Sequence, residues 1–255
     1  MFTRRFLLNL ALGAALAASP LAAQEMSLDQ LLQKNLEALG GSAALDKIQT
    51  LTQSGKMIMG GGQLEAPVVV KMKRPNKTWL EMKIQGRSFL RGYDGKNGWM
   101  TNPMTGSGEA QDIPAKELEE MEQTADMENS LGSFAGLKKA GHTVELLGKE
   151  DVEGTPAYKL KVTRKNGRTE THWLDGASFL PLKSVAKVNQ GGMEMEVESV
   201  VGNYKKIDGV MFAHSVEQKV QGKTAVQMTI EKVELNQPVD DSIFAKPAPP
   251  APVKQ

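Results

Sequence analysis

The 255-residue chain contains no cysteine, and that absence narrows what it can do. It excludes disulfides, thiolate metal sites, a cysteine nucleophile and lipid attachment to an N-terminal cysteine. A basic excess is absent too. The formal net charge is +1 with the signs interspersed, so no nucleic acid partner is indicated. Beyond the N-terminus no apolar run is long enough to cross a bilayer, so we expect a protein that does not span a membrane.

Motifs for catalysis are also missing. A serine in residues 132–136 stands one place too early for a nucleophile elbow, and Asp240-Asp241 is typical of a turn. The three histidines lack the spacing of a zinc site, so we predict no metal ligation. We therefore expect no enzymatic activity and no cofactor. The histidines are His142, His172 and His214.

The N-terminus has the pattern of a secretory signal. Arg4 and Arg5 precede an apolar run over residues 6–18, and small residues follow at Ala22 and Ala23. We expect residues 1–23 to be removed and the mature protein to reside in the periplasm. The arginine pair is compatible with ordinary secretory export and with the twin-arginine route, and both stay open.

Helical periodicity occurs in two places. Ser27 and Gln30 form a capping box before a stripe of leucines, and Gly40-Gly41 ends that helix. Residues 42–50 predict a second short helix. Between residues 112 and 139 the helical period returns, with Leu118 and Met121 on its apolar stripe.

In most of the remaining chain, apolar and polar residues alternate with a period of two. Between the helical segments, residues 51–103 predict four to five antiparallel strands, and after residue 141 about six more follow. Asn166-Gly167 is a strong hairpin signal. In the stretch "RGYDGKNGWMTNPMTG" two turn signals precede Trp99, which we interpret as the apolar anchor of a hairpin; a place at the mouth of a cavity is the alternative.

These elements predict an α+β fold. Ten to eleven antiparallel strands curl under their own twist into an open half-barrel, and the amphipathic helices cover its concave face. Residues 24–245 are expected to form this single domain. Residues 246–255, "KPAPPAPVKQ", are expected to form a disordered, proline-rich tail.

Alternate residues of a strand share one face, and Leu118 and Met121 share one side of a predicted helix. Together these two patterns predict an apolar cavity between the sheet and that helix. Fourteen methionines against seven phenylalanines make the apolar residues flexible, which suits a surface that must fit several apolar shapes. An ordinary solid core is the alternative for the same residues. The predicted lining consists of Met72, Leu80, Met82, Ile84, Trp99, Leu118, Met121, Met195 and Val197.

A series of short motifs in a fixed order resembles a known family. They are "EALGG", Arg74-Pro75, "YDG" with Gly98-Trp99, Val144-Glu145-Leu146, Tyr158, Trp173-Leu174-Asp175, Tyr204 with Gly209 and Phe212, and residues 240–244. In this order they resemble the outer-membrane lipoprotein-sorting-like proteins of the LolA/LolB superfamily, in its uncharacterised branch. No position matches the arginine with which the best-known carrier of that family holds its lid.

The resemblance implies a half-barrel with helices as a lid over an apolar cavity. It also implies a periplasmic carrier that buries a lipid, or the acyl chains of a lipoprotein, without covalent attachment. The alternative is an envelope sensing or assembly module that uses the same half-barrel for contacts with other envelope proteins and transports no ligand.

Overall fold

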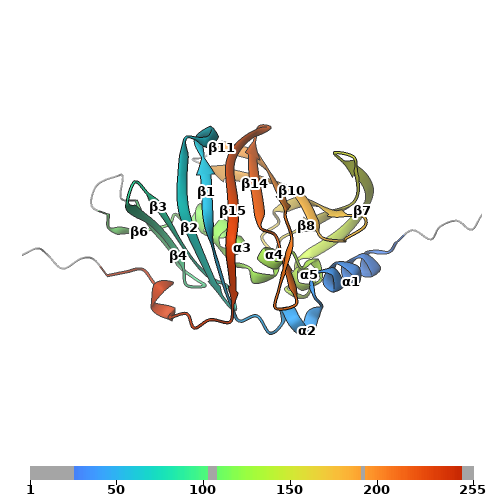
Figure 1. Cartoon of the computed structure of the whole chain (residues 1–255), viewed down its shortest axis with the longest axis horizontal. Coiled ribbons are helices and arrows are strands. Elements are labelled where there is room, and N and C mark those ends of the chain that lie inside the picture. The colour runs from blue at the N-terminus through green and yellow to red at the C-terminus, as the bar shows by residue number, and fades with distance from the viewer. Residues whose placement is uncertain (1–25, 103–107, 191–192, 249–255) are drawn as a thin grey trace, which may run out of the picture.

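One curved antiparallel sheet dominates the computed structural model, which describes residues 26–102, 108–190 and 193–248 (Figure 1). Among these residues thirteen strands form the sheet, in the order β6-β5-β4-β3-β2-β1-β15-β14-β11-β10-β9-β8-β7. The end strands β6 and β7 do not pair with each other in this described part, so the predicted open half-barrel is confirmed. The predicted signal peptide and residues 249–255 of the predicted tail lie outside the described residues.

The sheet consists of two halves that meet where β1 pairs with β15. The first half comes from residues 50–112. Its strands follow one another along the chain: β1 Thr50–Met59, β2 Leu64–Lys73, β3 Lys77–Ile84, β4 Arg87–Tyr93, β5 Gly98–Thr101 and β6 Ala110–Asp112. The turn between β4 and β5 is held by Asp94, whose carboxylate accepts hydrogen bonds from the amides of Lys96 and Asn97. The predicted hairpin around Trp99 is therefore confirmed.

The second half comes from residues 143–235. Its strands are β7 Thr143–Val152, β8 Thr155–Thr163, β9 Thr169–Asp175, β10 Pro181–Gln190, β11 Met193–Gly202, β14 Ser215–Val220 and β15 Lys223–Leu235. A separate pair, β12 Lys205–Ile207 and β13 Val210–Phe212, lies between β11 and β14 in the chain. Gly167, with a φ of 84°, provides the positive φ that the predicted turn between β8 and β9 requires.

The predicted ten to eleven strands are too few. The stretch around His214, predicted as one strand, is divided into β13 and β14, because the His214 amide bonds to the carbonyls of Gly202 and Asn203 instead of continuing the ladder. The three-residue strands β6 and β12 are the others that were missed. Strands this short show too few alternations to be recognised from a sequence.

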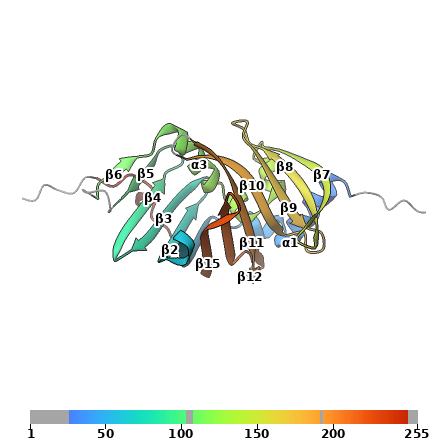
Figure 2. The ribbon, with the colours of Figure 1, turned by 90° about the horizontal axis from the view of Figure 1, so that it is seen from above.

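The α-helices lie on one face of the sheet, here called the inner face (Figures 1 and 2). α1 Leu28–Leu39 begins with the predicted capping box and ends at Gly40, and α2 Ser42–Leu45 is shorter than predicted. The insert between the two halves, residues 115–139, contains α3 Ala115–Ala125, α4 Met127–Leu131 and α5 Phe134–Lys139. Gly132, with a φ of 71°, ends α4.

Apolar side chains of the helices and the inner face form three clusters. In the centre, α1, α2 and α4 contribute to a cluster with Leu51, Met72 and Ile230. Beside it, α1 and α5 pack on β7, β8 and β9 around Leu160. At the far end of the first half, α3 packs on Tyr93. The core of the protein thus lies between the helices and the inner face.

Candidate functional site

The six strand residues of the predicted cavity lining share the inner face. Residues directly opposite each other in antiparallel strands point to the same side. Val70 pairs with Leu80 and Val68 with Met82, while in the second half Ala186 pairs with Val197. Following these pairs through β1, β15 and β14 joins both groups on one face. The members are Met72, Leu80, Met82, Ile84, Met195 and Val197.

Burial divides the predicted lining into filled and uncovered parts. Met72 is 2% exposed inside the central cluster, and Met121 of α3 is 1% exposed in the cluster around Tyr93. The others on the inner face, including Leu118 of α3, are only half-buried. The helices therefore fill the centre and the ends of the face but leave apolar stripes on β3 and on β10 and β11.

Trp99 does not belong with this set. It lies opposite Gly92 on the outer face, and it is buried, with 3% of its surface exposed. Its indole N–H donates to the carbonyl of Phe244, at 2.8 Å, and a Cβ on Gly92 would overlap its ring. The structure places Trp99 where it fastens the C-terminal segment to the sheet.

An apolar pocket of about 200 Å³ opens on the inner face between α4 and strands β14 and β15. Most of its wall is apolar and includes Leu131, Met211, Phe212, Val216 and Met228. Tyr204 adds an aromatic ring, and burial holds the pKa of its phenol far above the ordinary value, so the hydroxyl stays protonated and donates to the Pro181 carbonyl at 2.9 Å. None of these residues was among the predicted lining.

Two arginines, one from each half of the sheet, bind α4. From the first half, Arg74 pairs with Glu128 at 2.8 Å and donates from Nε to the Ile48 carbonyl at 2.8 Å. From the second half, Arg164 donates from Nη2 to Asn129 at 2.7 Å. Both contacts join residues far apart in the sequence, which is why no local pattern indicates them.

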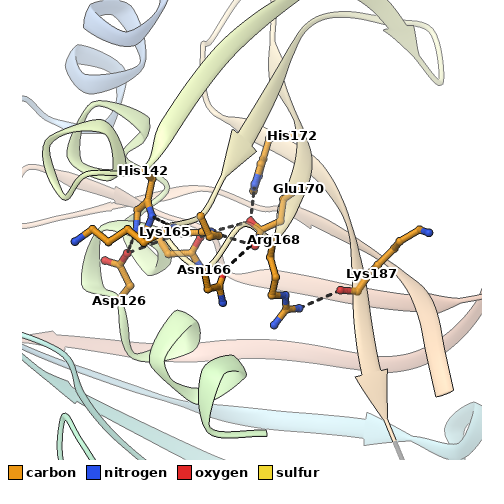
Figure 3. Close-up of polar contacts among 10 residues, drawn as sticks. Asp126, His142, Lys165, Asn166, Arg168, Glu170, His172 and Lys187 are labelled. Carbon is orange, nitrogen blue, oxygen red and sulfur yellow. Dashed lines mark hydrogen bonds and ion pairs between the residues drawn. The ribbon is translucent and has the colours of Figure 1, made fainter. Parts of the chain in front are cut away.

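Arg164 belongs to a buried charged network at the β8–β9 turn, together with Glu170 and His172, which are labelled in Figure 3. Its Nε and Nη2 bond to the two oxygens of Glu170 at 3.1 and 2.7 Å, and His172 Nε2 lies 3.0 Å from the same carboxylate. Burial by itself would raise the pKa of Glu170. Hydrogen bonds from His172 and Arg164, and the guanidinium charge, outweigh that effect and lower the pKa to about 2. The network therefore carries a carboxylate at neutral pH.

Two of the histidines, His172 and His214, make contacts that stabilise the fold. His172 also packs edge-on against Phe134 of α5, with ring centroids 5.0 Å apart, and His214 Nδ1 lies 2.7 Å from the Ile230 carbonyl. Over the described ranges no group of three or more histidine, aspartate or glutamate side chains is placed to hold a metal ion. Nor does any described helix combine the length and the apolar character needed to cross a membrane.

We compared this chain with known protein families, curated proteins and solved structures. A family model described as an uncharacterized protein matches residues 81–248. Among curated proteins, none matches this sequence.

Several solved structures share the fold. A LolA superfamily protein from Nitrosomonas europaea is 13% identical with a TM-score of 0.57, over 85% of this chain and 97% of that one. A DUF1329 family protein from Desulfovibrio piger is 14% identical with a TM-score of 0.57, over 85% and 96%. A domain described as that of an outer membrane lipoprotein-sorting protein, from Vibrio parahaemolyticus, is 16% identical with a TM-score of 0.56, over 84% and 96%. The predicted LolA-like half-barrel is thereby confirmed.

Proposed function

Because this chain belongs to that family of uncharacterized proteins and has the LolA-like fold, we propose that it is a periplasmic carrier. It binds a lipid, or the acyl chains of a lipoprotein, by burying them against the inner face. The proposal includes no catalytic step and no cofactor.

The apolar pocket beside α4 is the observation that supports this function most directly. Its volume of about 200 Å³ is below that of ordinary small-molecule pockets, which measure roughly 300–1,000 Å³. The pocket therefore takes only the end of a chain. The remainder of the chain would lie along the half-buried side chains of the inner face, such as Met195 and Val197.

Burial of methylene groups supplies the free energy for such binding. Each methylene removed from water contributes about 0.8 kcal/mol, so ten carbons give on the order of 8 kcal/mol before the cost of ordering the chain. Methionines such as Met211 and Met228 in the pocket wall adapt to chains of different length, because their side chains are unbranched and flexible.

Two measurements test the carrier function. Mass spectrometry of an organic extract of the protein, purified from its native envelope, should detect a bound lipid. A fluorescent fatty acid should bind the delipidated protein, and Met228→Gln should weaken that binding several-fold. Thr229→Gln is the matched control, because Thr229 is the exposed neighbour on the outer face. A clean extract together with no probe binding contradicts the proposal.

The periplasmic location rests on the predicted signal peptide. Fractionation of cells that express the full chain should place the protein, shortened by about 23 residues, in the periplasmic fraction. Retention of the full-length chain in the cytoplasm would contradict this part of the proposal.

A second candidate is an envelope sensing or assembly module that carries no ligand. The observation in its favour is that Met72 and Met121, two residues of the predicted lining, are packed in solid core. Such a protein would fold normally, bind no fatty-acid probe and work through contacts with other envelope proteins. The probe titration therefore separates the two candidates.

A further inference from the structure

A second cavity, of about 380 Å³, is lined mostly by charged and polar residues and is here called the polar cavity. It is bounded by α3, by the β2–β3 turn and by the β8–β9 turn, and four side chains labelled in Figure 3 line it: Asp126, His142, Lys165 and Asn166. Arg164 lines this cavity and bonds to Asn129, which lines the apolar pocket. This hydrogen bond of 2.7 Å connects a lining residue of one site to a lining residue of the other.

One nitrogen of Arg164 makes no hydrogen bond among the described residues. Its Nε and Nη2 are taken by Glu170 and Asn129, and the side chain is 4% exposed. Nη1 is buried and has no hydrogen-bond partner among the described residues. The nearest opposite charge is Asp126 Oδ2, at 3.9 Å, which is too far for a hydrogen bond.

His142 offers a second donor to the same place. Its Nδ1 accepts a hydrogen bond from the Lys165 amide at 3.3 Å, so the proton of the neutral ring is on Nε2. Burial, and then the positive charge of Arg164, lower the pKa of His142, which keeps the ring neutral at pH 7. Nε2 lies 3.6 Å from Asp126 Oδ2, again beyond hydrogen-bond distance.

Asp126 provides the acceptor. Its Oδ1 is used, because it caps α4 by accepting a hydrogen bond from the Glu128 amide at 3.0 Å. Its Oδ2 faces both donors at distances that leave each without a direct bond. A group placed among the three must accept hydrogen bonds from Arg164 and His142 and donate one to Asp126.

A hydroxyl group meets that requirement, since it carries one donor and two acceptor lone pairs. A carboxylate or phosphate donates nothing, and the three acidic side chains that line the cavity, Glu119, Glu122 and Asp126, outnumber its two cations, Arg164 and Lys165. An ammonium group accepts nothing and faces the guanidinium of Arg164. We propose that the polar cavity binds the hydroxyl groups of a glycerol- or sugar-type lipid headgroup whose chain enters the apolar pocket. This inference rests on the proposed carrier function.

Four amphiphiles with twelve-carbon chains test the proposal by displacement of the fluorescent fatty acid. They are 1-monolauroylglycerol, laurate, dodecylamine and methyl laurate. Monolauroylglycerol should displace the probe about tenfold more effectively than methyl laurate, the difference expected for one or two added hydrogen bonds. Free glycerol at the same concentration should displace nothing; displacement by glycerol alone would show that the cavity takes polyols without a chain and overturn the assignment to a lipid headgroup.

Two variants identify the site. Asp126→Asn keeps the cap of α4, because asparagine caps as well as aspartate, but replaces the facing oxygen by an N–H donor. His142→Phe removes the Nε2 donor at similar volume. Each should abolish the preference for monolauroylglycerol while leaving methyl laurate unchanged. Asp29→Asn, in the first turn of α1, is the matched control and should change neither.

The outcomes separate this inference from the carrier function. Failure of all four amphiphiles contradicts the carrier function itself. Equal displacement by all four leaves the carrier function standing and overturns the hydroxyl site. Strongest displacement by laurate or by dodecylamine would assign the cavity to a charged headgroup instead. A preference for monolauroylglycerol that survives both variants would place its headgroup elsewhere.

Discussion

The two halves of the sheet hold the helical insert with different kinds of contact. The first half uses Arg74, whose side chain is 24% exposed and whose partner Glu128 is 18% exposed. The second half uses Arg164, which is 4% exposed and is oriented by a carboxylate that is equally buried. The same residue type thus works at the surface in one half and in the interior in the other.

The burial of each ion pair determines how much its loss changes the stability of the fold. Ion pairs in reach of water are screened, and exposed pairs contribute at most about 1 kcal/mol. A buried pair contributes little in comparison with apolar residues, but removing one partner leaves a charge without compensation and costs much more. Loss of Arg164 should therefore cost more stability than loss of Arg74.

Arg164→Met should cause the largest loss of stability. It removes the buried guanidinium that compensates the charge of the Glu170 carboxylate, and the free energy of unfolding should fall by about 3–5 kcal/mol. Urea denaturation measures the change. The double variant Arg164→Met/Glu170→Leu should recover most of the loss, because no buried charge remains. A single variant within 1 kcal/mol of the parent would contradict the buried network.

Trp99→Ala tests an apolar contact of the first half, the one that fastens the C-terminal segment to the sheet. Truncation of the buried indole and loss of its bond to Phe244 should lower stability by about 3 kcal/mol. Trp79→Ala is the control on the same face, where the side chain is half-buried, and it should cost less. Lost probe binding with unchanged stability would instead assign Trp99 to the ligand.

Acid should weaken the second half. The folded-state pKa of Glu170, about 2, lies below the ordinary value of 4.5, so its contribution is present above pH 4.5 and is lost as the pH falls from 4.5 toward 2. By pH 3 the loss should be about 2 kcal/mol. Urea titrations at several pH values measure it. The Arg164→Met/Glu170→Leu variant should lose correspondingly less; the same acid loss in both proteins would mean that other carboxylates are responsible.

Arg74→Gln should have the smallest effect. The ion pair to Glu128 is partly exposed, so the loss should be about 1 kcal/mol and should shrink at high salt. Hydrogen exchange offers a more local measurement: amides of α4 should exchange faster in the variant, while those of β8 and β9 should not. A loss as large as that of Arg164→Met would remove the contrast between the halves.

Local patterns in the sequence were enough for much of the fold. The capping box and the leucine stripe predict helix α1, and Asp94-Gly95 and Asn166-Gly167 predict two hairpin turns. These features can be read from the sequence because each depends on residues only a few positions apart. Alternation likewise predicted that Met82 and Met195 share a face, since neighbouring residues in a strand point to opposite sides.

Only the tertiary structure decided which of those positions are filled and which stay open. Met72 and Leu80 both point to the inner face, yet of the two only Met72 is buried beneath the helices. Nothing near Met72 in the sequence indicates this difference in burial. The contact of Arg164 with Asn129 spans 35 positions, and that of Arg74 with Glu128 spans 54. Charged residues at such separations carry no periodic signal. Which charged residues pair depends on the position that the insert takes between the two halves of the sheet in the folded protein.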